Sequence, residues 1–137
     1  MNHGSVTCGK LRAVHRRILL AIFLGGAAGG LSRALLEREW PADGRSWPWV
    51  TFAVNAAGTA VLAFVVARLE PRRCARPLVG VGFCGALTTF SALQLEALEL
   101  AHRDHVALAI AYAGGSVGAG LVVALGVAAL ARPVGAP

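Results

Sequence analysis

The chain has 137 residues, of which 56% are hydrophobic and 15% charged, and its formal net charge is +6. This length fits one domain, but the composition is unlike that of a soluble domain and leaves no room for a soluble catalytic domain. The basic residues lie at the ends of apolar segments without interleaved aromatic residues, so they indicate anionic lipid headgroups and membrane topology rather than nucleic acid.

Four uncharged stretches make up most of the chain: residues 18–32, 46–67, 77–95 and 106–131. A membrane-spanning helix needs roughly 20 mainly apolar residues. We therefore predict an all-α membrane protein with four transmembrane helices. These helices are expected at about residues 18–36, 48–69, 77–98 and 106–130. They would form one four-helix transmembrane domain, residues 18–131, between a basic cytoplasmic N-terminal tail (1–17) and a short C-terminal tail (132–137).

The first apolar segment follows a basic stretch, residues 10–17, and resembles a signal peptide with a small-residue cleavage site at residues 27–30. Because the segment stays apolar to Leu36, a first membrane helix with a basic flank is the better interpretation. Its GGAAGG motif at residues 25–30 places glycines four apart twice, a spacing that lets helix backbones approach closely. Arg33 follows, either as an interfacial arginine that snorkels, which its position favours, or as a buried cation that attracts anions.

The second apolar segment begins beside three tryptophans, Trp40, Trp47 and Trp49. Their amphipathic rings favour the headgroup level and mark one membrane face. At the centre of the segment stands Asn55, whose amide is costly at mid-membrane unless it is hydrogen-bonded. Two roles are open for it: a structural hydrogen bond between helices, or a donor that faces a conducted anion.

The third apolar segment contains GFCGALTTFS at residues 82–91, so glycines and hydroxyl groups lie at mid-depth. In hydrocarbon, polar groups are tolerated only where they are buried in protein or line a polar path. We predict two half-helices with a break near residues 85–88, which would direct backbone carbonyls inward, where they can coordinate a cation. The alternative is a mildly kinked helix whose hydroxyls bond their own carbonyls. The carboxylates of Glu96 and Glu99 are expected to face water or headgroups.

The fourth apolar segment combines glycines with hydroxyl groups. Tyr112 and Ser116 are four residues apart and therefore share one helix face, as do Gly114 and Gly118. One face can pack closely while the other presents hydroxyls, an arrangement that suits a helix between a partner and a pore.

In combination these segments resemble the Fluc (CrcB-type) fluoride channels. The motifs occur in the family's order: GGAAGGLSR at residues 25–33, TFAVNAAGT at 51–59 and GFCGALTTFS at 82–91. The resemblance extends to about Gly120. It implies an inverted dimer of two antiparallel subunits, each with its third helix broken near the middle. It also implies that the dimer lets fluoride leave a bacterial cell passively across the plasma membrane, which lowers cytoplasmic fluoride toxicity.

The resemblance also implies roles for individual residues. Backbone carbonyls of Gly85 and Thr88 would hold a structural sodium ion at the dimer centre. The implied fluoride pathway consists of Asn55, Phe90, Ser91, Tyr112, Ser116 and Arg33. Amide and hydroxyl donors can replace the water shell of a small anion, and a phenyl edge carries the positive part of the ring quadrupole.

The chain departs from the family pattern at two positions. Leu93 stands where the family has a second pore-facing phenyl ring, three residues after Phe90, and leucine offers no positive edge. Gly120 stands where the hydroxyl track of the fourth helix can continue, so this track is shorter here.

The charge distribution bears on topology and partners. Nine Lys and Arg lie on the side shared by the termini and the second loop, against four on the other side. The positive-inside rule then predicts both termini in the cytoplasm. Antiparallel copies of one chain would favour a similar number of Lys and Arg on the two sides of the membrane. The second subunit is therefore either another copy or a homologue with the opposite charge bias.

Two other classes are alternatives to a channel. A small multidrug-type dimeric transporter relies on a glutamate within its first helix, and the first segment here has no acidic residue before Glu37. A non-conducting assembly subunit would not need so many polar groups at membrane depth. An enzyme is not expected, because the sequence has no nucleophile–base pair and no metal-ligand set.

Overall fold

The structure is a computed structural model that describes residues 4–70 and 74–131, so the expected C-terminal tail lies outside the described residues. Every regular element in these ranges is helical. Four helical stretches are long and apolar enough to cross a membrane: Val14–Glu39, Trp49–Arg68, Pro77–His102 and Val106–Ala131. The predicted all-α class and the four spans are therefore confirmed.

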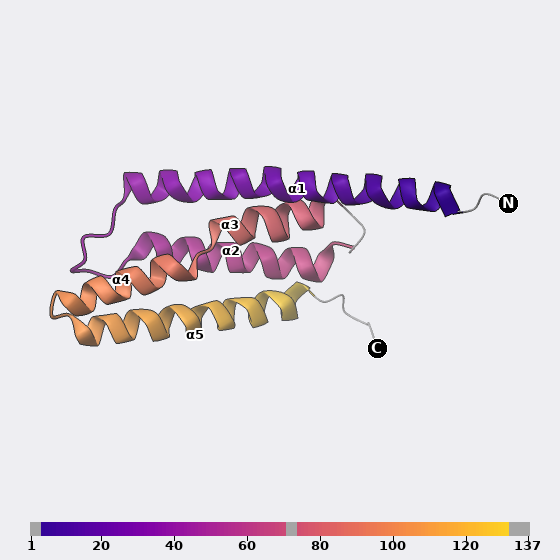
Figure 1. The fold of residues 1–137 in the computed structure, drawn as a ribbon. Helices are drawn as coiled ribbons and strands as arrows, with labels where there is room; N and C mark the ends of the chain where they lie inside the picture. Colours follow the sequence, from indigo (N-terminus) through magenta and orange to yellow (C-terminus); the bar gives the residue numbers. More distant parts are fainter. Residues whose placement is uncertain (1–3, 71–73, 132–137) are drawn as a thin grey trace.

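The first helix, α1, runs from Gly4 to Glu39 and so begins well before the expected start near residue 18. Residues 4–17 contain no proline, and the backbone hydrogen bonds of a helix do not depend on hydropathy, so the helix continues past the apolar segment. Figure 1 shows this part of α1 extending beyond the ends of the other helices.

The other elements are α2 (Trp49–Arg68), the π-helical segment η1 (Pro77–Cys84), α3 (Gly85–Leu87), α4 (Phe90–His102) and α5 (Val106–Ala131). The third span, made of η1, α3 and α4, passes through the middle of the bundle (Figure 1). Its first half packs mainly against α1, whereas α4 packs against α5, and α2 also packs on α5. The helix α4 ends four residues beyond the expected position, at His102.

The contact between α1 and η1 is made by backbones. A Cβ atom on Gly25 would overlap the carbonyl oxygen of Leu78, and one on Gly29 would overlap that of Phe83. From the opposite side, a Cβ atom on Gly82 would lie 2.6 Å from the carbonyl oxygen of Ile22. The expected close approach is therefore present, and glycine is required on both helices.

Only one of the two glycine pairs of α1 makes this contact. A Cβ atom on Gly26 would come no closer than 4.0 Å to Gly82, and one on Gly30 would meet nothing within 4 Å. The second pair has the same spacing but leaves room for a Cβ atom at both positions.

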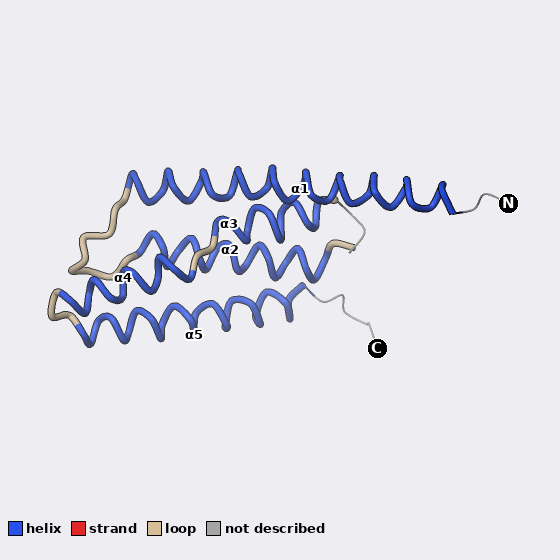
Figure 2. Tube along the Cα trace, viewed as in Figure 1, coloured by secondary structure: helices blue, strands red, loops and turns tan. Residues whose placement is uncertain are grey.

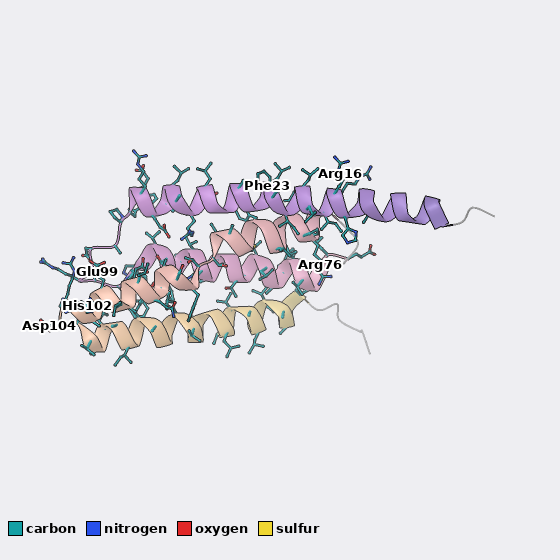
Figure 3. The ribbon with its side chains drawn as sticks, viewed as in Figure 1. Arg16, Phe23, Arg76, Glu99, His102 and Asp104 are labelled. Atoms are coloured by element: carbon teal, nitrogen blue, oxygen red, sulfur yellow. The ribbon has the colours of Figure 1, made fainter. Side chains whose placement is uncertain are left out.

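Side chains divide the molecule into an apolar middle and two charged ends. Arg16 and Arg76 lie at one end, whereas Glu99, His102 and Asp104 lie at the other (Figure 3). Between these ends, large apolar side chains stay exposed on the outer faces of the helices. The most exposed include Phe23, Ile110, Val122 and Leu130. Such faces are expected where the neighbour is lipid rather than water.

Candidate functional site

The connection between α3 and α4 has extended backbone at both of its residues. Thr88 has φ −78° and ψ 145°, and Thr89 has φ −146° and ψ 128°. Thr88 closes the preceding turn, since its backbone N–H and its hydroxyl donate to the carbonyl of Cys84 at 2.9 and 2.8 Å. The hydroxyl of Thr89 accepts from the N–H of Ala92 at 3.3 Å and so caps α4. Figure 2 shows this connection as a short non-helical segment within the third span.

Asn55 of α2 is bound to this connection. Its Nδ2 donates to the carbonyl of Thr89 at 3.0 Å, and its Oδ1 accepts the N–H of Thr89 at 2.8 Å. One side chain thus satisfies both backbone polar groups of a residue that has left the helical hydrogen-bond pattern. Of the two roles left open for Asn55, the structure contains the interhelical hydrogen bond. A carboxamide has two N–H donors, and one of them is not used by this pair.

These hydrogen bonds change the surroundings of two carbonyls. In a continuous helix the N–H of Thr89 would bond the carbonyl of Gly85, but it donates to Asn55 instead. Likewise the N–H of Ala92, which would bond the carbonyl of Thr88, donates to the hydroxyl of Thr89. The carbonyls of Gly85 and Thr88 therefore lose their usual helical donors.

A cavity of about 260 Å³ adjoins the connection. It brings together Asn55, Phe90 and Ser116, three of the expected pathway residues, from α2, α4 and α5. The Oγ atom of Ser116 is buried and has no hydrogen-bond partner within the described part of the chain. Leu93 and Gly120, the two departures from the family pattern, also line this cavity. We call it the inner cavity.

Ser91 and Tyr112, also expected in the pathway, do not line the inner cavity. Ser91 is exposed, and its hydroxyl lies 3.0 Å from that of Thr89. Tyr112 is fully buried, and its hydroxyl donates to Oε2 of Glu96 at 2.6 Å. The hydroxyls of Tyr112 and Ser116 thus have different surroundings although they lie on one helix face.

Glu96 is half-buried and borders an open hollow described below, and the sequence pattern did not reveal the hydrogen bonds that hold its carboxylate. Besides Tyr112, the hydroxyl of Thr51 donates to it, to Oε1 at 2.6 Å. Thr51 is only 3% exposed. Two donors can hold a carboxylate inside the protein. The signal was present in the sequence: Glu96 lies three residues after Leu93 and four before Leu100, and both leucines are buried.

A second, larger hollow of about 510 Å³ lies between the first loop, α2 and α4, and Glu37, Thr51 and Glu96 are among the residues that line it. We call it the outer hollow. Phe52, next to Thr51, lines the inner cavity, and so does Leu93, next to Ala92 of the outer hollow. The two spaces therefore adjoin consecutive parts of the same helices, with Thr51 and Glu96 near their boundary.

Arg33 lies near the outer hollow, because its ion-pair partner, Glu37, lines that hollow. Its Nη1 lies 3.1 Å from Oε1 of Glu37, one turn later in α1, and its side chain is 31% exposed. Its Nε atom is buried without a hydrogen-bond partner among the residues that the structure describes. Arg33 is thus half-buried and ion-paired. Its position is intermediate between that of an interfacial arginine that snorkels and that of a buried cation.

Asp43 in the first loop adds a negative charge to the outer hollow. Hydrogen bonds from the backbone N–H groups of Arg45 and Ser46 and from the Ser46 hydroxyl lower the pKa of Asp43 to about 2. Its carboxylate therefore stays ionised at neutral pH.

The sequence matches the family model described as CrcB-like protein, Camphor Resistance (CrcB), over residues 20–128. The Fluoride-specific ion channel FluC 1 of Mycolicibacterium paratuberculosis is 44% identical over 110 residues, which cover 77% of this chain and 83% of the relative. FluC 2 of Nocardia farcinica is 40% identical over 124 residues, covering 87% and 89%. FluC of Stutzerimonas stutzeri is also 40% identical over 124 residues, covering 85% and 98%.

Proposed function

Since this chain belongs to the CrcB-like family, we propose that it is a fluoride-specific ion channel that lets fluoride leave the cell passively. The protein is a multi-pass integral membrane protein, and the family places it in the bacterial plasma membrane. A family of ion channels performs no covalent catalysis, so the residues along the pathway act by binding and electrostatics.

The observation that carries the proposal is the inner cavity. A buried hydroxyl without a partner, such as that of Ser116, is costly unless it donates to something in the cavity. Asn55, which has a second N–H, and Phe90 line the same cavity. These groups offer an anion one hydroxyl donor, one amide donor and the positive edge of a phenyl ring, with no cationic side chain that would trap it.

In this proposal fluoride passes between the outer hollow and the inner cavity. Arg33 attracts the anion near the rim of the outer hollow, and the hydroxyl of Tyr112 influences its passage through Glu96. Ser91 would then act outside the inner cavity, where its exposed hydroxyl lies against Thr89. The family has two pore-facing phenyl positions, here Phe90 and Leu93, so Phe90 would supply the only phenyl ring of this pair.

The resemblance to Fluc channels implies a sodium ion, and we assign it to the carbonyls of Gly85 and Thr88. Their loss of helical donors supports this assignment, because sodium is coordinated by such carbonyls at unwound helix segments. Bound there, sodium would supply a fixed positive charge and satisfy the carbonyls.

We further propose an antiparallel dimer, formed with a second copy or with a homologue of opposite charge bias. Two exposed features of this subunit support a partner. The ring of Phe90 is 65% exposed, and Cβ atoms on Gly114 and Gly118 would meet nothing within 4 Å. Small residues on an open helix face allow another helix to approach closely.

The test is anion flux from liposomes that contain the purified protein. We expect fluoride efflux that greatly exceeds chloride efflux and needs neither ATP nor an ion gradient other than that of fluoride. Equal chloride flux, or no fluoride flux from a correctly assembled dimer, would contradict the channel. Export of an organic cation driven by protons would instead support the multidrug-type alternative. An assembled dimer that moves no solute would support the non-conducting subunit.

A further inference from the structure

The indole of Trp47, two residues before α2, is held by aromatic rings on several sides. Its ring centroid lies 5.4 Å from that of Tyr112 and 5.6 Å from that of Phe52, both in edge-to-face geometry. The ring of Trp49 lies 5.8 Å away in a tilted orientation. A Cβ atom on Gly115 would lie 3.0 Å from Cη2 of Trp47, so the indole rests against the bare backbone of α5.

One of these rings carries the hydroxyl that binds Glu96. Tyr112 is fully buried, and its hydroxyl and that of Thr51 each donate to a different carboxylate oxygen at 2.6 Å. A phenol has one O–H donor at the end of a rigid ring, so the position of the ring decides whether the donor reaches Glu96. An edge-to-face partner on that ring therefore restricts where the hydroxyl can lie.

We propose that Trp47, seated against Gly115, is a positioning residue that controls fluoride flux by holding the hydroxyl of Tyr112 on Glu96. This inference rests on the proposed function. Glu96 lines the outer hollow, where a carboxylate repels an approaching anion. With a donor on each oxygen, the carboxylate has a fixed orientation and part of its charge is offset by the hydroxyl dipoles. Without the support of Trp47, Tyr112 can turn away, and Glu96 is then free to rotate into the outer hollow.

The role of Trp47 is tested by comparing two substitutions. Trp47→Phe keeps an aromatic ring beside Tyr112, whereas Trp47→Leu removes it. The Nε1 atom of Trp47 has no hydrogen-bond partner in the described ranges, so Trp47→Phe removes no hydrogen bond to any of these residues. We expect Trp47→Leu to lower fluoride flux by about tenfold, the size expected for losing one hydrogen bond to a charged group. Trp47→Phe should keep most of the flux. Trp40→Leu, at an exposed tryptophan that lines the outer hollow but makes no ring contact with Tyr112, is the comparison for loss of a tryptophan from this loop. A loss of flux as large as that of Trp47→Leu would contradict the role assigned to Trp47.

The second part of the experiment asks whether the effect passes through the hydroxyl. In a Tyr112→Phe background the hydrogen bond to Glu96 is already absent, so Trp47→Leu should cause no further loss of flux. Losses that multiply in the double variant would overturn the proposal, as would wild-type flux in Trp47→Leu. A wild-type protein that moves no fluoride would instead overturn the proposed function.

Gly115 provides a variant that remains informative if Trp47→Leu fails to fold. Gly115→Ala should displace the indole and lower flux, whereas in a Trp47→Phe background the same change should have little effect, because phenylalanine lacks the atom that approaches Gly115. Equal losses in both backgrounds would contradict the seating of Trp47 on Gly115. Dimer content by size-exclusion chromatography is measured for every variant, so that a loss of flux is compared only between assembled proteins.

Discussion

The two halves of the third span are built on different principles. The first half, η1 and α3, is joined to α1 by direct backbone contacts at Gly25, Gly29 and Gly82. The second half, α4, is joined to its neighbours by side chains that carry hydrogen bonds, chiefly through Glu96. The contact of the first half with α1 therefore tolerates no side chain at these three glycines, whereas the second half depends on particular polar atoms. The comparison indicates that one half supports the structure and the other provides the chemistry.

The largest expected effect comes from adding volume to the contact between α1 and the first half. Gly25→Val would force side-chain atoms into the carbonyl of Leu78, and we expect it to destabilise the protein by about 3 kcal/mol or to prevent folding. Gly30→Val is the matched control in the same helix, because nothing lies within 4 Å of a Cβ atom there. Thermal unfolding in detergent measures both. Equal stability of the two variants would contradict the supporting role of the first half.

At the junction between the halves, we expect Asn55→Asp to reduce fluoride flux by about 100-fold. The new carboxylate repels the anion and replaces the donor to the carbonyl of Thr89 by an acceptor. Asn55→Ala loses both hydrogen bonds without adding a charge, so the difference between the two variants in liposome flux measures the electrostatic part. Undiminished flux in Asn55→Asp would remove Asn55 from the pathway.

The smallest effect is expected in the second half. Thr51→Val keeps the shape of the side chain but leaves Glu96 with one hydroxyl donor, and flux should fall by about threefold to tenfold. Thr51→Ser restores the hydroxyl and should recover most of the flux. If the Thr51→Val variant conducts as well as Thr51→Ser, the hydrogen bond from Thr51 to Glu96 has no role in conduction.

The sequence predicted the spans and part of the inner cavity because these depend on local patterns. Apolar length identified the four spans, and polar groups at mid-depth identified Asn55 and Ser116, which do line one cavity. It did not predict the hydrogen bonds of Glu96, because their donors, Thr51 and Tyr112, lie 45 and 16 residues away in the sequence.

The glycines of α1 illustrate the same limit. The pair at Gly25 and Gly29 and the pair at Gly26 and Gly30 have identical spacing, so the sequence cannot tell which of them meets η1. The choice depends on how α1 is rotated about its axis, which is set by packing. The early start of α1 was not predicted for a related reason, since hydropathy marks the membrane boundary and not the end of a helix.

The extension of α1 has a practical consequence for measuring orientation. Fourteen helical residues, 4–17, precede Ile18, where the uncharged segment begins, and at 1.5 Å per residue they carry the chain about 21 Å beyond it. A fluorophore attached near Gly4 would therefore stand clear of the lipid headgroups. If the subunits of a dimer are antiparallel, a quencher added to the outside of sealed vesicles would extinguish half of this signal and leave the other half until the vesicles are opened.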